Sequence, residues 1–114
     1  HLTGSDDPTD VVEGLWREGR AAVVITDGPH GAYLRSPAAA AVQHVPAYPV
    51  TVRDTHGCRD VFHGAYAFGL LTEQPAAVRV RLASAAAAVV AALPSGARRV
   101  PDMTAVDRLM AAGR

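Results

Sequence analysis

A turn made of small residues runs directly into an apolar, helix-patterned segment between Asp54 and Ala65, and this junction constrains the fold most strongly. A helix start leaves four backbone N–H groups without partners and carries a partial positive charge. Small residues such as Gly57 let an anion approach the backbone closely, so the junction suits a phosphate group. We expect Asp60 in the first helical turn, where a carboxylate is placed to accept a proton from an attacking hydroxyl.

Composition and charge exclude several classes of protein. A length of 114 residues fits one domain, and a hydrophobic content of 49% excludes a disordered tail. The formal net charge is zero, so we expect no nucleic-acid partner. All 11 basic residues are arginine, which excludes a Schiff-base lysine and a phosphate-loop lysine from this chain.

Cysteine usage and apolar runs predict a cytoplasmic protein. The single cysteine, Cys58, cannot form an internal disulfide. The first residues show no signal-peptide pattern. The longest apolar run, Ala83–Leu93, is too short to cross a bilayer, so we expect no membrane partner.

The first half of the chain is expected to form one helix and four short strands. Asp6, Asp7 and Pro8 make a helix-start signal, and Gly19 is suited to end that helix. Residues 21–26 form a short run that is rich in β-branched residues and shows no alternation, which favours a strand buried on both faces. The other strands are expected at residues 32–35, 42–47 and 50–52, with a turn at 27–31.

Two long helices are expected next. The first follows Asp60 and contains Gly64 and Gly69, each of which costs about 1 kcal/mol against alanine. A close neighbour or a ligand would explain why these two glycines are tolerated. The second helix is rich in alanine, restarts at Pro75 and ends near Pro94.

A last helix is expected at residues 105–112, opened by a capping-box pattern with Thr104 as the cap and Asp107 in the glutamate position. The whole order predicts an α/β fold in which helices cover the strands. Four short strands are too few to cover three helices, so we expect another segment or chain to complete the sheet. The aromatic residues expected in the core are Trp16, Phe62, Tyr66 and Phe68.

Several stretches of the chain resemble the ribokinase-like sugar kinases, also called the phosphofructokinase-B family. Residues 54–65 resemble the family's second signature, which reads Asp-Thr, a short variable step, Gly-Ala/Cys-Gly-Asp, an aromatic residue and Gly-Ala. Residues 24–32 resemble its Thr-x-Gly-x-x-Gly strand and turn, which lies near the nucleotide phosphates. Residues 81–88 resemble the helix beside the adenine pocket, and residues 96–101 fit the usual ending.

The resemblance implies the C-terminal part of a three-layer α/β/α sandwich, with short strands followed by three helices. Residues 1–114 would form a single domain, the nucleotide-binding part, while the sugar-binding part and the lid would be absent. The Asn-x-x-Glu motif that helps to organise magnesium has no counterpart either. A further departure is Arg59, which stands where the family has glycine.

The resemblance also assigns roles at the junction. Asp60 would be the catalytic base that activates a sugar hydroxyl. The alternative is an ordinary acid at a helix N-terminus, which stabilises a helix by about 1 kcal/mol or less. The backbone N–H groups of Gly57, Cys58 and Arg59 would form an anion hole, where each preorganised donor contributes about 3 kcal/mol to the transition state.

Arg59 allows three interpretations. Its guanidinium would bind a phosphate directly, or fill the space that the phosphate needs, or point to solvent. We favour impairment, because a large side chain replaces none in a site of close approach and a cation opposes the helix dipole. The hypothesis is that Arg59→Gly raises phosphoryl transfer.

The nucleotide would contact Thr26, Gly28, Gly31 and Ser84 by resemblance. A Gly-x-x-Gly turn between strands is common by itself, and a serine in an alanine-rich helix is often a small packing residue. Asp54 and the carbonyls near it resemble the monovalent-cation loop of some family members. The alternative for this residue is a simple turn aspartate.

Four residues near the junction invite a metal-site interpretation, but their spacing argues against it. No pair among them has a standard ligand spacing, so we predict no protein-held metal there. The four are His56, Cys58, Asp60 and His63.

The motifs together predict an ATP-dependent carbohydrate kinase, present as a partial chain, that uses Mg²⁺ and, as in some members, a monovalent cation. It would transfer the γ-phosphate of ATP to a sugar hydroxyl by positioning and electrostatics. The isolated chain is expected to be inactive, because it lacks the sugar pocket and lid that exclude water. The alternative is a degenerate nucleotide-binding module or a structural remnant, whose free sheet edge pairs with a second copy or with the absent part.

Overall fold

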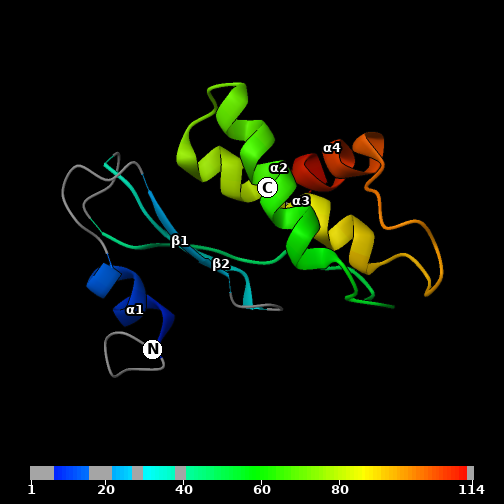
Figure 1. The fold of residues 1–114 in the computed structure, drawn as a ribbon, viewed down its shortest axis with the longest axis horizontal. Coiled ribbons are helices and arrows are strands. Elements are labelled where there is room, and N and C mark those ends of the chain that lie inside the picture. The colour runs from blue at the N-terminus through cyan, green and yellow to red at the C-terminus, as the bar shows by residue number, and fades with distance from the viewer. Residues whose placement is uncertain (1–6, 16–21, 27–29, 38–40, 113–114) are drawn as a thin grey trace. The chain divides into compact units, whose positions relative to one another are not determined.

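The computed structural model describes residues 7–15, 22–26, 30–37 and 41–112 (Figure 1). The chain divides into two compact units, residues 1–46 and residues 47–114. Strands in the first unit and three helices in the second make this an α/β chain, as predicted.

The first unit opens with helix α1, Pro8–Leu15. The Asp7 carboxylate accepts the N–H of Thr9 at 2.8 Å, and Pro8 occupies the first helical position. A side-chain cap followed by proline is a strong helix start, so this prediction is confirmed. The helix packs against strands β1 and β2, which are Val23–Thr26 and Ala32–Arg35.

The sheet of the first unit is an antiparallel meander in the order β1-β2-β3, with β3 at Gln43–Val45. Tyr33 lies opposite His44, and their rings stack with centroids 4.6 Å apart. The His44 Nε2–H also donates to the His30 carbonyl at 2.6 Å. These contacts hold the third strand in register, because cross-strand ring pairs stabilise a sheet.

One expectation for this sheet is wrong. The first strand was predicted to be buried on both faces, yet only Val23 is buried and Thr26 is exposed. An antiparallel strand at the edge of the described sheet covers one face only, so its residues divide between core and solvent. The core of the unit contains Val12 and Leu34, which are both fully buried.

The second unit consists of helices α2, Cys58–Leu71, α3, Ala76–Ala91, and α4, Met103–Ala112. Figure 1 shows α3 beside both α2 and α4, and α3 contacts each of these helices. Small side chains allow this close packing, because alanine lets two helix backbones approach. The buried alanines of α3 are Ala83, Ala85, Ala86, Ala88 and Ala91.

The strand expected at residues 50–52 is not present, because residues 46–52 form no regular element. The chain is tied to the end of α3 instead. Arg53 and Asp54 both donate their N–H groups to the Ala91 carbonyl, at 2.7 and 3.1 Å. A strand needs a paired neighbour, and this segment finds a helix terminus in its place.

Phe68 corrects the predicted core. Phe62 is buried as expected and Tyr66 is partly buried, whereas Phe68 is 55% exposed. Phe68 lines an apolar groove of about 350 Å³ on the second unit, so its helical spacing places it on a face that the described residues of this unit leave open. Trp16 lies outside the described residues. The other residues lining the groove are Val61, Gly64, Ala65, Leu82, Ala86, Pro101 and Met103.

Helix α4 begins two residues before the predicted start, and the predicted capping box is wrong. Asp102 accepts the N–H of Thr104 at 3.0 Å through its carboxylate, and its carbonyl accepts the N–H of Val106 at 3.0 Å. Aspartate is among the best helix caps, so the helix begins directly after Asp102 and places Thr104 inside the first turn.

Replacing Asp102 with alanine is expected to lower the free energy of unfolding by about 1 kcal/mol, because it removes the side-chain cap of α4. Thr104→Ala is the matched control, and its effect should be much smaller because Thr104 is exposed. Urea denaturation of both variants measures the difference. A greater loss from Thr104→Ala would restore the capping-box interpretation.

Candidate functional site

The first turn of α2 presents free backbone donors. The Cys58 N–H donates to the Thr55 carbonyl at 3.1 Å, and the Val61 N–H donates to the Gly57 carbonyl at 3.0 Å. The N–H groups of Arg59 and Asp60 have no hydrogen-bond partner among the described residues. They are the donors that a helix N-terminus offers to an anion.

Gly57 caps α2 in a conformation that favours glycine. Its φ of 76° lies in the left-handed region, which strains residues with a Cβ atom. An added Cβ would meet Arg99 Cβ at 3.7 Å and Cγ at 3.9 Å, which is ordinary contact. Backbone conformation, and not crowding, is therefore the reason for glycine here.

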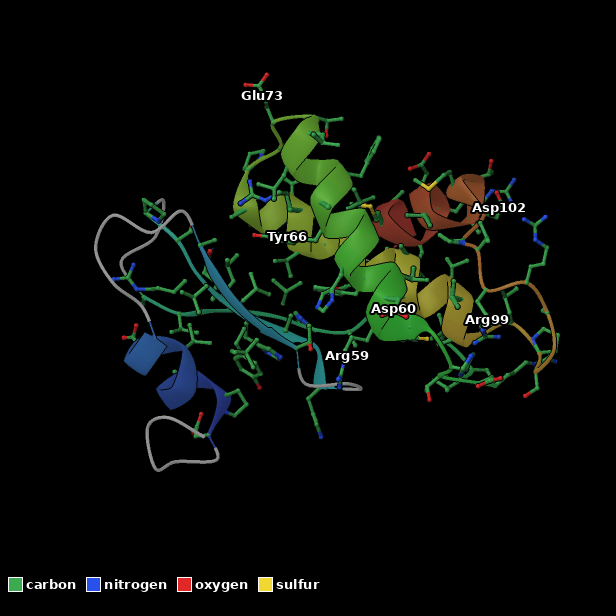
Figure 2. The ribbon with its side chains drawn as sticks, viewed as in Figure 1. Arg59, Asp60, Tyr66, Glu73, Arg99 and Asp102 are labelled. Carbon is green, nitrogen blue, oxygen red and sulfur yellow. The ribbon has the colours of Figure 1, made fainter. Side chains whose placement is uncertain are left out.

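Arg59 and Asp60 both belong to this first turn and both are exposed (Figure 2). Asp60 is the third residue of the helix, where a carboxylate interacts favourably with the dipole. The same position leaves its oxygens accessible to a hydroxyl. The exposed Arg59 side chain makes no ion pair or hydrogen bond with a described residue, so it is free to turn toward an anion or away from it.

The Asp54 carboxylate stabilises the loop that precedes α2. It accepts the N–H of His56 at 2.9 Å. This hydrogen bond, the nearby Ser95 side chain and the positive charge of Arg99 hold the pKa of Asp54 below its ordinary value, although partial burial opposes them. The side chain therefore closes an Asx turn ahead of α2 and stays ionised.

Arg99 was missed by the sequence analysis, yet it holds this loop in place. Its Nη2 donates to the Asp54 carbonyl and its Nε donates to the His56 carbonyl at 3.0 Å. Its Nη1 faces the carbonyls of Leu93 at 3.5 Å and Pro94 at 3.4 Å. Figure 2 shows Arg99 near the end of α3. No local pattern signals these contacts, because Arg99 lies 45 residues from Asp54 in the chain.

Cys58 is a half-buried thiol that packs against α3. Its Sγ–H donates to the Ala87 carbonyl at 3.6 Å. Burial raises the pKa of Cys58, and the nearby charge of Arg99 only partly offsets this effect. A raised pKa favours the protonated thiol, which is a poor nucleophile, and the contact with the Ala87 carbonyl makes Cys58 part of the packing between α2 and α3.

The predicted nucleotide residues fall in different units, each of which is described by itself. Thr26 is exposed at the end of β1, and Gly31 is buried with a φ of 95° directly before β2. Ser84 is partly buried in the middle of α3. Gly28 lies outside the described residues. The second unit therefore brings together Asp54 and the junction residues 57–60.

The four residues near the junction are not arranged as metal ligands. Within the described ranges, no group of three or more histidine, cysteine, aspartate or glutamate side chains is arranged to hold a metal ion. His63 instead meets the Phe62 ring edge-on, with centroids 6.2 Å apart.

Among the helices that the structure describes, none has the length and apolarity needed to span a bilayer.

Comparison with known proteins gives consistent matches. Residues 1–103 match the family described as pfkB family carbohydrate kinase. The bifunctional protein HldE of Bradyrhizobium diazoefficiens is 43% identical over 68 residues, which are 60% of this chain and 14% of that protein. A ribokinase crystal structure from Thermotoga maritima has a TM-score of 0.71 and 26% identity, covering 82% of this chain and 31% of that chain.

One similar structure, a plant ribokinase, was solved with ribose and ATP bound. Ribokinase of Arabidopsis thaliana, complexed with ribose and ATP, has a TM-score of 0.69 and 26% identity. The match covers 79% of this chain and 29% of that chain. The chain thus spans less than a third of the length of each of these three relatives.

Proposed function

Because the chain belongs to the pfkB family of carbohydrate kinases, we propose that it supplies the catalytic base and the phosphate-binding turn of an ATP-dependent carbohydrate kinase. The observation that carries the proposal is the start of α2. There, unpartnered N–H groups, a glycine cap and an exposed carboxylate lie within one turn. This combination suits transfer of a phosphoryl group to a hydroxyl.

Asp60 is the proposed base. Its carboxylate would take the proton of the acceptor hydroxyl as that oxygen attacks the γ-phosphate of ATP. The backbone around Gly57, Cys58 and Arg59 would form the anion hole. Since the Cys58 N–H is held by Thr55, the donors we assign to the phosphate are those of Gly57, Arg59 and Asp60.

ATP is the proposed phosphate donor, with Thr26, Gly28, Gly31 and Ser84 along the nucleotide. The plant ribokinase complex with ATP supports this donor. Mg²⁺ is proposed to arrive on the phosphates, because it keeps several waters and needs only one or two carboxylates from a protein. A sugar acceptor, a cytoplasmic setting and a further chain or segment that completes the sugar site are parts of the same proposal.

The second candidate is a nucleotide-binding module without catalysis. Arg59 favours it, because a bulky cation stands on the turn that would hold the transferring phosphate. In this case the chain would bind ATP or ADP but transfer no phosphoryl group, or would serve as a structural partner of a second copy.

The two candidates are tested by melting the chain with and without Mg-ADP, beside Arg59→Gly. We expect Mg-ADP to raise the Tm of both proteins, and to raise it more for the variant. Removing the side chain opens the turn and removes a cation from the helix start, so about tenfold tighter binding, or about 1.4 kcal/mol, is expected.

Arg98→Gly is the matched control, because it removes the same charge from an exposed position outside the helix. This control should respond to Mg-ADP as the unchanged chain does. An equal or smaller ligand shift for Arg59→Gly would show that Arg59 does not obstruct the phosphate. No response by any of the proteins would reject nucleotide binding by this chain.

A further inference from the structure

The guanidinium of Arg99 is surrounded by backbone carbonyl oxygens. Asp54 and His56 supply two of them from the loop before α2, and Leu93 and Pro94 supply two from the segment after α3. All three guanidinium nitrogens take part. We call these four oxygens the carbonyl cage.

Such a set of ligands is the chemistry of a cation site. Carbonyl oxygens carry only partial negative charge, and sets of them replace the hydration shell of hard cations such as K⁺. In this chain the positive charge comes from a side chain instead. Guanidinium is weakly hydrated and presents its N–H groups in a fixed fork, so it fits a group of fixed oxygens well.

The position of the cage connects it to the start of α2. The loop that supplies two of its oxygens also donates the N–H groups of Arg53 and Asp54 to the Ala91 carbonyl, at the end of α3. The stem of Arg99 passes the Cα of Gly57, where an added Cβ would lie 3.7 Å away. One arginine therefore fixes the last residues before the turn against the end of α3.

We propose that Arg99 is a built-in cation, which fills the carbonyl cage in place of a bound monovalent ion and positions the turn at the start of α2. The monovalent cation expected at Asp54 does not fit this arrangement, because the Arg99 guanidinium already lies at the carbonyls of Asp54 and His56 and its charge would repel a second cation there. The chain therefore requires no added K⁺ at this loop. Arg99 acts here as a positioning residue.

The test is the Tm of the unchanged chain, Arg99→Ala and Arg98→Ala in KCl and in tetramethylammonium chloride at equal ionic strength. Tetramethylammonium is too large for the cage. We expect the unchanged chain and Arg98→Ala to melt alike in both salts. Arg99→Ala should lose about 5 °C or more in tetramethylammonium and regain part of that loss in KCl.

Each other result overturns the proposal. An equal loss of Tm by Arg99→Ala in both salts rejects the carbonyl cage as a cation site. No loss of Tm by this variant rejects the positioning role of Arg99. A higher Tm of the unchanged chain in KCl shows that an ion site exists beside Arg99. Should Arg99→Ala fail to fold, Arg99→Lys decides: its ammonium keeps the charge, so its Tm should be independent of K⁺.

A second consequence rests on the proposed function. Phosphoryl transfer by the natural protein that carries this chain should proceed equally in the two salts. Since the melting experiment contains no nucleotide, a failure of the kinase proposal leaves its result unchanged, and the two proposals can fail separately.

Discussion

Asp60→Asn is expected to lower the kcat for phosphoryl transfer by a factor of about 10² to 10⁴ in the natural protein that carries this chain. Asparagine keeps the size of the side chain and its place in the first turn of α2, but it cannot accept the proton of the acceptor hydroxyl. The KM for ATP should change little, because the backbone donors of the turn remain. Steady-state release of ADP measures both constants.

Asp107→Asn is the matched control for this prediction. Asp107 is also an exposed helical aspartate, and it belongs to α4 and not to the proposed turn. Its kcat should stay close to that of the unchanged protein, because Asp107 has no part in the proposed chemistry. Full activity of Asp60→Asn would remove Asp60 from the chemistry and leave it as a helix-dipole acid.

Two glycines of α2 should respond in opposite directions to alanine. A Cβ on Gly69 would lie 2.8 Å from Cγ and 3.3 Å from Cβ of Arg79, so the stem of that buried arginine would have to move. We expect Gly69→Ala to lower the free energy of unfolding by about 1–3 kcal/mol. Displacing Arg79 would also disturb its hydrogen bond to the Gln74 carbonyl and its contact with the Tyr66 ring.

Gly64→Ala is the control on the same helix. Nothing lies within 4 Å of the Cβ that it would add, so only the helix propensity changes. We expect a gain of up to about 1 kcal/mol. Urea denaturation of both variants gives the comparison. Equal effects of the two substitutions would show that contact with Arg79 does not explain the glycine at 69.

Local patterns in the sequence predicted much of this fold. The cap at Asp7, the strand at 32–35 and the helix that carries Asp60 in its first turn are all present as expected. Each depends on neighbours a few residues away, which a sequence displays directly. The close neighbour expected beside a glycine of α2 is also present, at Gly69.

The features that were missed depend on distant residues. The segment at 50–52 has the composition of a strand, but its neighbour in space is the end of α3. Phe68 keeps the helical spacing of a core residue and yet faces an open groove. The guanidinium of Arg99 meets carbonyls on two separate segments, which no periodicity or motif connects.

The buried alanines of α3 also bear on how the second unit reaches its structure. Alanine has no rotamer freedom to lose, so packing it costs little side-chain entropy. The contacts among α2, α3 and α4 join helices that follow one another along the chain, which keeps the loops between contacting residues short. Helical proteins rich in such local contacts fold within microseconds to milliseconds. The turn before α2 would therefore form early in folding, as soon as α2 and α3 pack together.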